Sequence, residues 1–220
     1  MNPTPRDHIV KSYDDELHRL AGEIVTMGQQ AVSQLEDAII ALLQRDPALA
    51  QSIDQRDDAL DNKELEVDHD VARLLVLRQP AATDLRGVIA ALRVSSDIER
   101  IGDYGVNIAR RSLTLEAPVP EALVPGLTQL AALATKAVRD VMRAWQGRDT
   151  ALAQTIWDGD DAIDDAYVKF FSDVLQHMQD QPEDIAVCTQ LLFVAKNLER
   201  TGDHVSNIAE NIWFAAEGKL

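Results

Sequence analysis

Two eleven-residue segments, one hundred positions apart, carry the side chains of this chain that are best suited to do chemistry. Residues 99–109 read ERIGDYGVNIA and residues 199–209 read ERTGDHVSNIA, with seven identical positions. Each segment places a glutamate, an aspartate and an asparagine at intervals of four residues. On an α-helix this spacing forms a single stripe. Carboxylate and amide oxygens arranged in such a stripe favour the binding of a hard metal cation.

The two stripes consist of Glu99, Asp103 and Asn107 in the first segment and Glu199, Asp203 and Asn207 in the second. In a helical projection the apolar positions of each segment cluster on the other side, so we expect these side chains to face outward. For one pair alone, a solvated helix face is the ordinary explanation. Two carboxylates at i, i+4 nevertheless repel each other by about 0.2–0.5 kcal/mol. Their recurrence in both segments favours a bound cation, which would reverse the sign of that interaction.

One stripe cannot enclose an ion, so a neighbouring helix must supply further oxygens. In the first half these are spaced four, three and four residues apart: Asp57, Asp61, Glu64 and Asp68. The matching positions of the second half are Asp160 and Asp164, followed by Tyr167 and Phe171 in place of the last two acids. The two halves are therefore expected to bind metal differently or unequally. Favourable interaction of acids with a helix start explains part of the second set equally well.

Hydrophobic periodicity predicts the helices that position these residues. We expect helices at about 8–44, 47–78, 80–115, 121–146, 149–178 and 181–218, with proline-containing breaks before most of them. The segment 117–120, with two prolines in four residues, is the clearest linker. The predicted fold is all-α, with two tandem, pseudo-symmetric antiparallel three-helix bundles at residues 1–116 and 117–220. Gly102 and Gly202 lie within the motif segments, where they favour close helix packing or a functional role.

Composition restricts the class of partner. The formal net charge is −16, with 21 basic and 37 acidic side chains, so nucleic acid is disfavoured and cations or basic protein surfaces are favoured. Cys188 is the single cysteine, which excludes an intrachain disulfide and a cysteine-based zinc site. The N-terminal segment lacks an apolar signal core, and no apolar run approaches a membrane span. We therefore expect a soluble cytoplasmic protein.

Other chemical motifs are weak. Asp15 and Glu66 each precede a histidine by three residues, a spacing typical of di-iron bundles. Glu66 projects away from its core stripe, however, whereas di-iron ligands point inward. His177 and His204 have no recognisable partner in the sequence, and no phosphate-binding loop, nucleophile elbow or Cys–His pair is present. The sequence therefore predicts no catalytic residues and no enzyme activity.

The motifs together resemble the PhoU family of phosphate-transport accessory and regulatory proteins. The matching pieces are residues 8–17, residues 78–86 and the two Glu-Arg-x-Gly-Asp segments, in that order along the whole chain. The resemblance implies two similar three-helix bundles that bind metal at their surfaces. Glu99 and Asp103, with Glu199 and Asp203, match the family motif; Asp57 and Asp61, with Asp160 and Asp164, match its facing acids. The candidate ions are Mg²⁺, Mn²⁺, iron, Zn²⁺ and Ca²⁺.

The resemblance also implies a function that no spacing shows. Members of the family act with the ATPase subunit of the phosphate ABC transporter and with a phosphate-sensing histidine kinase. They regulate phosphate uptake and homeostasis, repress the phosphate-starvation response when phosphate is plentiful, and are usually homodimers. Two alternatives stay open at this stage: a phosphoester hydrolase that uses clustered metals, and a ligand-free structural bundle.

Overall fold

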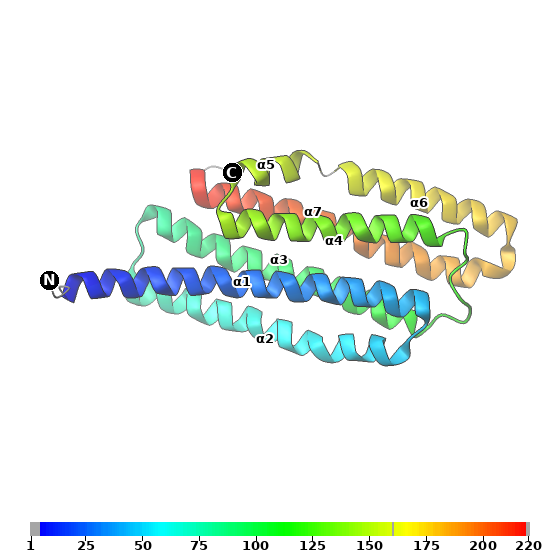
Figure 1. Cartoon of the computed structure of the whole chain (residues 1–220), viewed down its shortest axis with the longest axis horizontal. Coiled ribbons are helices and arrows are strands. Elements are labelled where there is room, and N and C mark those ends of the chain that lie inside the picture. Colours follow the sequence, from blue (N-terminus) through cyan, green and yellow to red (C-terminus); the bar gives the residue numbers. More distant parts are fainter. Residues whose placement is uncertain (1–4, 160, 219–220) are drawn as a thin grey trace.

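The chain folds into long helices joined by short loops (Figure 1). This computed structural model describes residues 5–159 and 161–218, with side chains from Asp14 onward. The first half contains α1 (Pro5–Gln44), α2 (Pro47–Arg78) and α3 (Ala82–Ser112). The second half contains α4 (Val124–Gly147), α5 (Thr150–Asp158), α6 (Asp161–Asp180), the 3₁₀ turn η1 (Pro182–Asp184) and α7 (Ile185–Glu217). The described residues contain no strand, and the predicted all-α fold is confirmed.

Local side-chain chemistry explains where α2 and α5 begin. The carboxylate of Asp46 accepts hydrogen bonds from the backbone N–H groups of Ala48 and Leu49, both at 3.0 Å. Asp149 caps α5 in the same way, because its carboxylate accepts the N–H of Leu152 at 2.9 Å. These N-caps satisfy backbone donors that have no partner within the helix. The predicted breaks before residues 47 and 149 are therefore confirmed with a physical cause.

Three predicted helix boundaries need correction. The helix expected over 149–178 is present as two segments, because Gly159 ends α5 with its N–H bonded to the carbonyl of Ile156 at 3.2 Å. Glycine is a poor helix former, which favours a helix end at this position. The helix expected from residue 121 begins at Val124, with Pro125 in its first turn, a position where proline is favoured. The helix expected over 80–115 is shorter and spans Ala82–Ser112.

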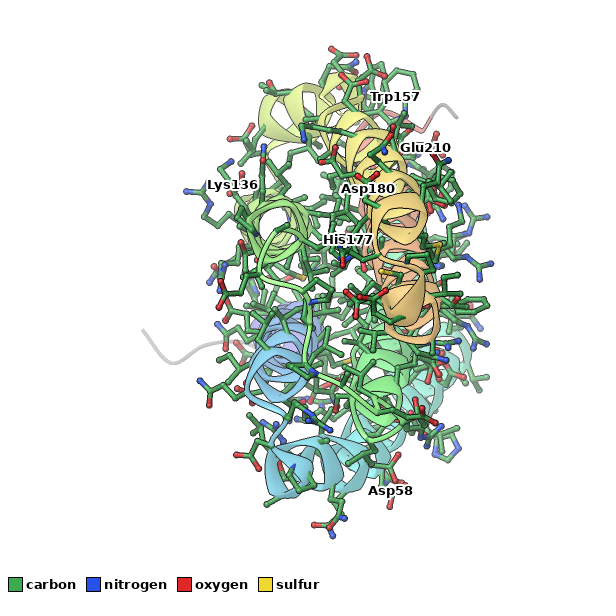
Figure 2. All side chains as sticks on the ribbon, turned by 90° about the vertical axis from the view of Figure 1, so that its right-hand side faces the viewer. Asp58, Lys136, Trp157, His177, Asp180 and Glu210 are labelled. Atoms are coloured by element: carbon green, nitrogen blue, oxygen red, sulfur yellow. The ribbon has the colours of Figure 1, made fainter. Side chains whose placement is uncertain are left out.

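Helices α3 and α7 form the centre of the molecule (Figure 1). Helix α3 packs against α1, α2 and α7, whereas α7 packs against α3, α4, α5 and α6. One continuous hydrophobic core runs through both halves. Figure 2 views the bundle end-on, with Asp58 of α2 at one extreme of the cross-section and Trp157 of α5 at the other. In the described part of the chain, no helix combines the length and apolar character needed to cross a bilayer.

Helices α3 and α7 cross in opposite directions, as their contacts show. Arg93, in the first half of α3, donates a hydrogen bond to Asn211 near the end of α7, at 3.4 Å. Arg111 at the end of α3 bonds to Gln190 near the start of α7, at 2.9 Å. Between these two contacts, Tyr104 of α3 meets His204 of α7, its counterpart in the sequence repeat, with 3.0 Å between the Tyr104 hydroxyl and His204 Nε2. The two motif segments therefore lie side by side within one antiparallel helix pair.

Candidate metal centre

The four acids expected to act together in the first half lie on two helices that pack against each other, α2 and α3. Asp57 and Asp61 belong to α2, whereas Glu99 and Asp103 belong to α3. The negative charge of Asp103 contributes to a raised pKa at each of the other three carboxyl groups. Such mutual effects require the groups to lie close together, because charge–charge interaction falls with distance. The structure therefore brings these predicted residues into one cluster, which we call the first-half acidic cluster.

Glu99 is the most perturbed member of the first-half acidic cluster. Burial raises its pKa to about 7 from its usual value of 4.5, and the charge of Asp103 raises it further than any other neighbour. The charges of Glu64 and Asp61 act in the same direction, whereas Arg100 opposes them. The side chain is only 14% exposed. Burial and the neighbouring acids disfavour the ionised form of Glu99 despite the nearby Arg100, which is why its pKa lies near neutrality.

Asp57 shows the same effect on the facing helix. Burial is the main cause that raises its pKa to about 6, followed by the charges of Asp61 and Asp103. Its Oδ1 atom is buried and has no hydrogen-bond partner among the described residues. Arg110 lowers the pKa of Asp57, but its guanidinium is committed to Asp54, at 2.6 Å. A buried, unpartnered carboxylate oxygen beside other acids is the feature that a bound cation would satisfy.

The residues of this cluster fit a hard cation by donor type, but they do not form a closed site. Arg100 is the neighbouring cation, with its guanidinium 3.0 Å from Asp103 and 3.4 Å from Glu99. Within the described residues, no three His, Cys, Asp or Glu side chains converge closely enough to hold an ion as they stand. Oxygen ligands are those that Mg²⁺, Mn²⁺ and Ca²⁺ prefer. A cation would therefore require side-chain rotation that draws the α2 and α3 carboxylates together and displaces Arg100.

The expectation that the motif acids face outward is wrong for the two glutamates. Glu99 and Glu199 are each 14% exposed, whereas Asp103 is 33% exposed. Asn107 does point to solvent, as predicted. The projection of a single helix identifies the side away from its own core stripe, but it cannot show that a neighbouring helix covers that side. Here α2 packs beside α3 and α6 packs beside α7, and each covers the first turn of the motif.

The second half has a different arrangement. Glu199 forms an ion pair with Lys196, whose Nζ atom is 2.5 Å from Glu199 Oε2. This oxygen is buried and, like Asp57 Oδ1, accepts no hydrogen bond among the described residues, so the contact is an ion pair without hydrogen-bond geometry. Asp203 and Asp164 are exposed, and Asp160 lies outside the described residues. Asn207 is exposed and donates a hydrogen bond across the helix pair to Asp97, at 3.4 Å. The described acids of the second half therefore differ from those of the first in that a lysine, Lys196, contacts the motif glutamate.

Comparison with known proteins identifies the family. A sequence model described as the PhoU domain matches residues 24–112 and again residues 127–212. The chain belongs to the PhoU family. The two matches are tandem copies of one PhoU domain, in agreement with the predicted internal repeat. The proposed boundary at residues 116 and 117 stays a prediction.

Relatives and solved structures agree with this assignment. A phosphate-specific transport system accessory protein PhoU homolog from Xylella fastidiosa (strain 9a5c) is 44% identical over 219 residues, covering 100% of this chain and 92% of that protein. A homolog of the same description from Caulobacter vibrioides (strain NA1000 / CB15N) is 42% identical over 214 residues, covering 97% and 93%.

The fold agrees with two PhoU crystal structures. The structure of PhoU from Pseudomonas aeruginosa has a TM-score of 0.88 at 31% identity and covers 94% of this chain and 100% of that chain. The phosphate transport system regulatory protein PhoU from Streptococcus pneumoniae gives 0.87 at 32% identity, covering 94% and 98%. Two tandem three-helix PhoU units are thus the architecture of this chain, with the fifth helix in two segments.

Sequence reasoning missed the contacts of the two histidines in this PhoU chain. His204 lies between the halves, with its Nε2 atom 3.0 Å from the hydroxyl of Tyr104 and its Nδ1 atom 2.9 Å from Asp97. His177 contacts Asp184 at 2.7 Å. Tyr104 and His204 occupy the same position of the repeat, one hundred residues apart. That equivalence was visible in the sequence, but only the crossing of α3 and α7 reveals that the two side chains meet.

The motif glycine of the first half serves close packing. A methyl group at Gly102 would overlap Leu60 Cδ2 and lie 2.9 Å from Gln34 Oε1. Glycine therefore lets α1 and α2 approach α3 at the level of the acidic cluster. Of the two roles predicted for this residue, the structure supports the packing role.

Proposed function

We propose that this chain is a non-enzymatic regulator of phosphate uptake that binds a hard metal cation between α2 and α3. The observation that carries the metal site is the first-half acidic cluster, with the pKa of Glu99 raised to about 7 and a buried, unpartnered oxygen on Asp57. Family membership carries the regulatory role. The relatives are described as accessory proteins of the phosphate-specific transport system, and one solved relative as a regulatory protein.

The carboxylates of the cluster would hold the cation, with Glu99 and Asp103 on α3 and Asp57 and Asp61 on α2. The metal would supply positive charge at a place where the fold collects negative charge and buries it. Glu99 must lose its proton before it binds a cation, so binding releases a proton at neutral pH. Arg100 must also leave the cluster. Its guanidinium then becomes available at the surface of α3, where it is already more than half exposed.

The partners we propose are the ATPase subunit of the phosphate ABC transporter and a phosphate-sensing histidine kinase. The net charge of −16 favours docking against basic patches of such partners. A cation bound between α2 and α3 changes the charge and the side-chain order of one acidic face, which is the physical means by which metal would affect docking. Through these contacts the chain would repress the phosphate-starvation response. We also propose that it acts as a homodimer in the cytoplasm.

The test compares two double variants that remove the same charge. The change Glu99→Gln with Asp103→Asn removes two carboxylates from the cluster. The matched control, Glu116→Gln with Glu121→Gln, removes two exposed carboxylates from the connection between α3 and α4. Protein purified without chelator is measured for bound metal, for helicity and for capture of the transporter ATPase. We expect the first variant alone to lose metal at unchanged helicity. Equal metal content in both variants would refute the site.

The non-enzymatic part has a separate test. Wild-type protein saturated with Mn²⁺ is expected to give no turnover of phosphate esters above the buffer rate. Metal-dependent turnover that disappears in the Glu99→Gln, Asp103→Asn variant would overturn this part of the proposal, because it would place hydrolytic chemistry at the same carboxylates.

A further inference from the structure

The two repeats differ at the residue one helical turn before the motif glutamate. In the second half this residue is Lys196, and its Nζ atom lies 2.5 Å from Glu199 Oε2. The equivalent residue of the first half, one hundred positions earlier, is Ser96, which is exposed and uncharged. Because residues three apart on a helix are neighbours, Lys196 adds a cation at a position where the first half has none. The attached cation beside the first-half glutamate is instead Arg100, whose Nε atom is 3.4 Å from Glu99 Oε2.

The helices that face the two motifs, α2 in the first half and α6 in the second, also differ in the side chains that they place beside the motif glutamate. Helix α2 presents Glu64, whose charge acts on Glu99, whereas the equivalent residue of α6 is Tyr167. The ring centroid of Tyr167 lies 5.5 Å from Lys196 Nζ and 6.0 Å from the centroid of the Phe171 ring. An aromatic face attracts an ammonium group but offers no strong oxygen ligand to a divalent ion. The surroundings of Glu199 therefore suit an ammonium group better than a metal.

We propose that the ammonium group of Lys196 takes the place of a metal cation in the second half, so that the chain binds hard cations selectively at the first-half acidic cluster. This inference rests on the metal site proposed above and specifies which copy of the motif forms it. A divalent ion that enters the second half must displace Lys196 from both Glu199 and Tyr167. In return it gains fewer carboxylates than the first half offers, because aromatic residues replace Glu64 and Asp68.

Mn²⁺ titration of the full chain, followed by the loss of the free-ion electron paramagnetic resonance signal, tests this selectivity. Wild type is expected to show one class of strong sites. Glu99→Gln with Asp103→Asn should abolish this class, whereas Glu199→Gln with Asp203→Asn should leave it unchanged within twofold. Circular dichroism of every variant confirms that helicity is retained.

The decisive variant is Lys196→Ser, which gives the second half the residue of the first. We expect Mn²⁺ to bind the second half at least tenfold more tightly than in wild type, and this gain to disappear when Glu199→Gln is added. Lys136→Ser is the matched control, because Lys136 also pairs with an acid on its own helix, Asp140 at 2.6 Å. Figure 2 places Lys136 of α4 on the side of the molecule opposite Glu210 of α7. This control should not change Mn²⁺ binding.

The outcomes separate this inference from the function on which it rests. The inference is overturned if wild type shows two classes of Mn²⁺ sites of equal strength. It is also overturned if Glu199→Gln with Asp203→Asn removes the strong binding. In either case the proposed metal-binding function still holds. No gain of binding in Lys196→Ser also overturns the inference. If wild type binds no Mn²⁺ strongly and neither pair of motif acids affects the titration, the proposed metal function fails and the inference fails with it.

Discussion

The first-half acidic cluster makes the stability of the metal-free protein decrease as pH rises from about 4.5 to about 7. The pKa of Glu99 is about 7 in the fold and 4.5 as its usual value, so over this interval the folded chain retains a proton that the unfolded chain has lost. The folded state binds more protons, and the free energy of unfolding therefore falls with increasing pH. Below pH 4.5 both states are protonated and the effect of Glu99 is absent.

The size of the effect follows from the shift. One pKa unit corresponds to about 1.4 kcal/mol, so the shift from 4.5 to about 7 at Glu99 sets an upper limit of about 3.5 kcal/mol on the stability lost by pH 8. Because the side chain keeps 14% exposure and couples to Asp103, we expect about 1–3 kcal/mol. Asp57, with a pKa of about 6, adds a loss in the same direction that is centred at lower pH.

Urea unfolding at pH 5 and pH 8 in EDTA measures this loss. The change Glu99→Gln removes the titrating group and should raise the free energy of unfolding at pH 8 by about 1–3 kcal/mol relative to wild type, with a much smaller difference at pH 5. Glu121→Gln, an exposed control, should follow wild type at both pH values within about 0.5 kcal/mol. If Glu99→Gln and wild type show the same dependence on pH, the partial burial of Glu99 and the reasoning built on it are refuted.

The same experiment with Mn²⁺ links stability to the proposed site. A ligand that binds only the folded state stabilises it by about 2.7 kcal/mol at one hundred times its dissociation constant. Because protons compete for Glu99 and Asp57, Mn²⁺ should stabilise wild type much more at pH 8 than at pH 5. Equal stabilisation at both pH values would assign binding to carboxylates outside this cluster.

Two further predictions concern packing. Gly102→Ala should destabilise the protein by about 1–3 kcal/mol, because the new methyl group overlaps Leu60. Gly22→Ala should be neutral or stabilising by up to about 1 kcal/mol, because nothing described lies within 4 Å of a Cβ atom at Gly22. Thermal unfolding of the two variants checks this contrast, and equal shifts would contradict it. Burial of Cys188 raises the pKa of its thiol, so a thiol reagent should modify it at least tenfold more slowly in the folded protein than in urea.

Most of the fold follows from the sequence because its causes are local. Apolar periodicity and the prolines define the helices, and the caps at Asp46 and Asp149 begin two of them. The sequence did not predict the interruption at Gly159, because a glycine lowers the stability of a helix by only about 1 kcal/mol and does not by itself decide whether the helix continues. Gly102 lies in the uninterrupted helix α3, where packing against Leu60 favours the helical path. At Gly159 the same residue type ends the helix.

The candidate site was predictable in its members but not in its environment. The spacing of Glu99 and Asp103, and of Asp57 and Asp61, predicts two stripes, and the structure places them on facing helices. The burial of Glu99 depends on how closely α2 approaches α3, which is a tertiary property. The pairing of Lys196 with Glu199 was accessible from their spacing of three residues. It becomes informative only when Ser96 is recognised as the first-half counterpart.

The internal repeat shows which identities of the motif require a functional explanation. Among the seven positions shared by residues 99–109 and 199–209, the glycine, isoleucine and alanine are buried in both copies. Packing of the central helices accounts for these three, as the fit of Gly102 against Leu60 illustrates. The glutamate, arginine, aspartate and asparagine are not fully buried in either copy, so packing does not account for them. Around these four shared residues the neighbours have diverged, with Ser96 against Lys196 and Glu64 against Tyr167. Equal motifs in unequal surroundings, with Arg100 beside Glu99 and Lys196 beside Glu199, are therefore the physical basis for expecting the two halves to bind metal unequally.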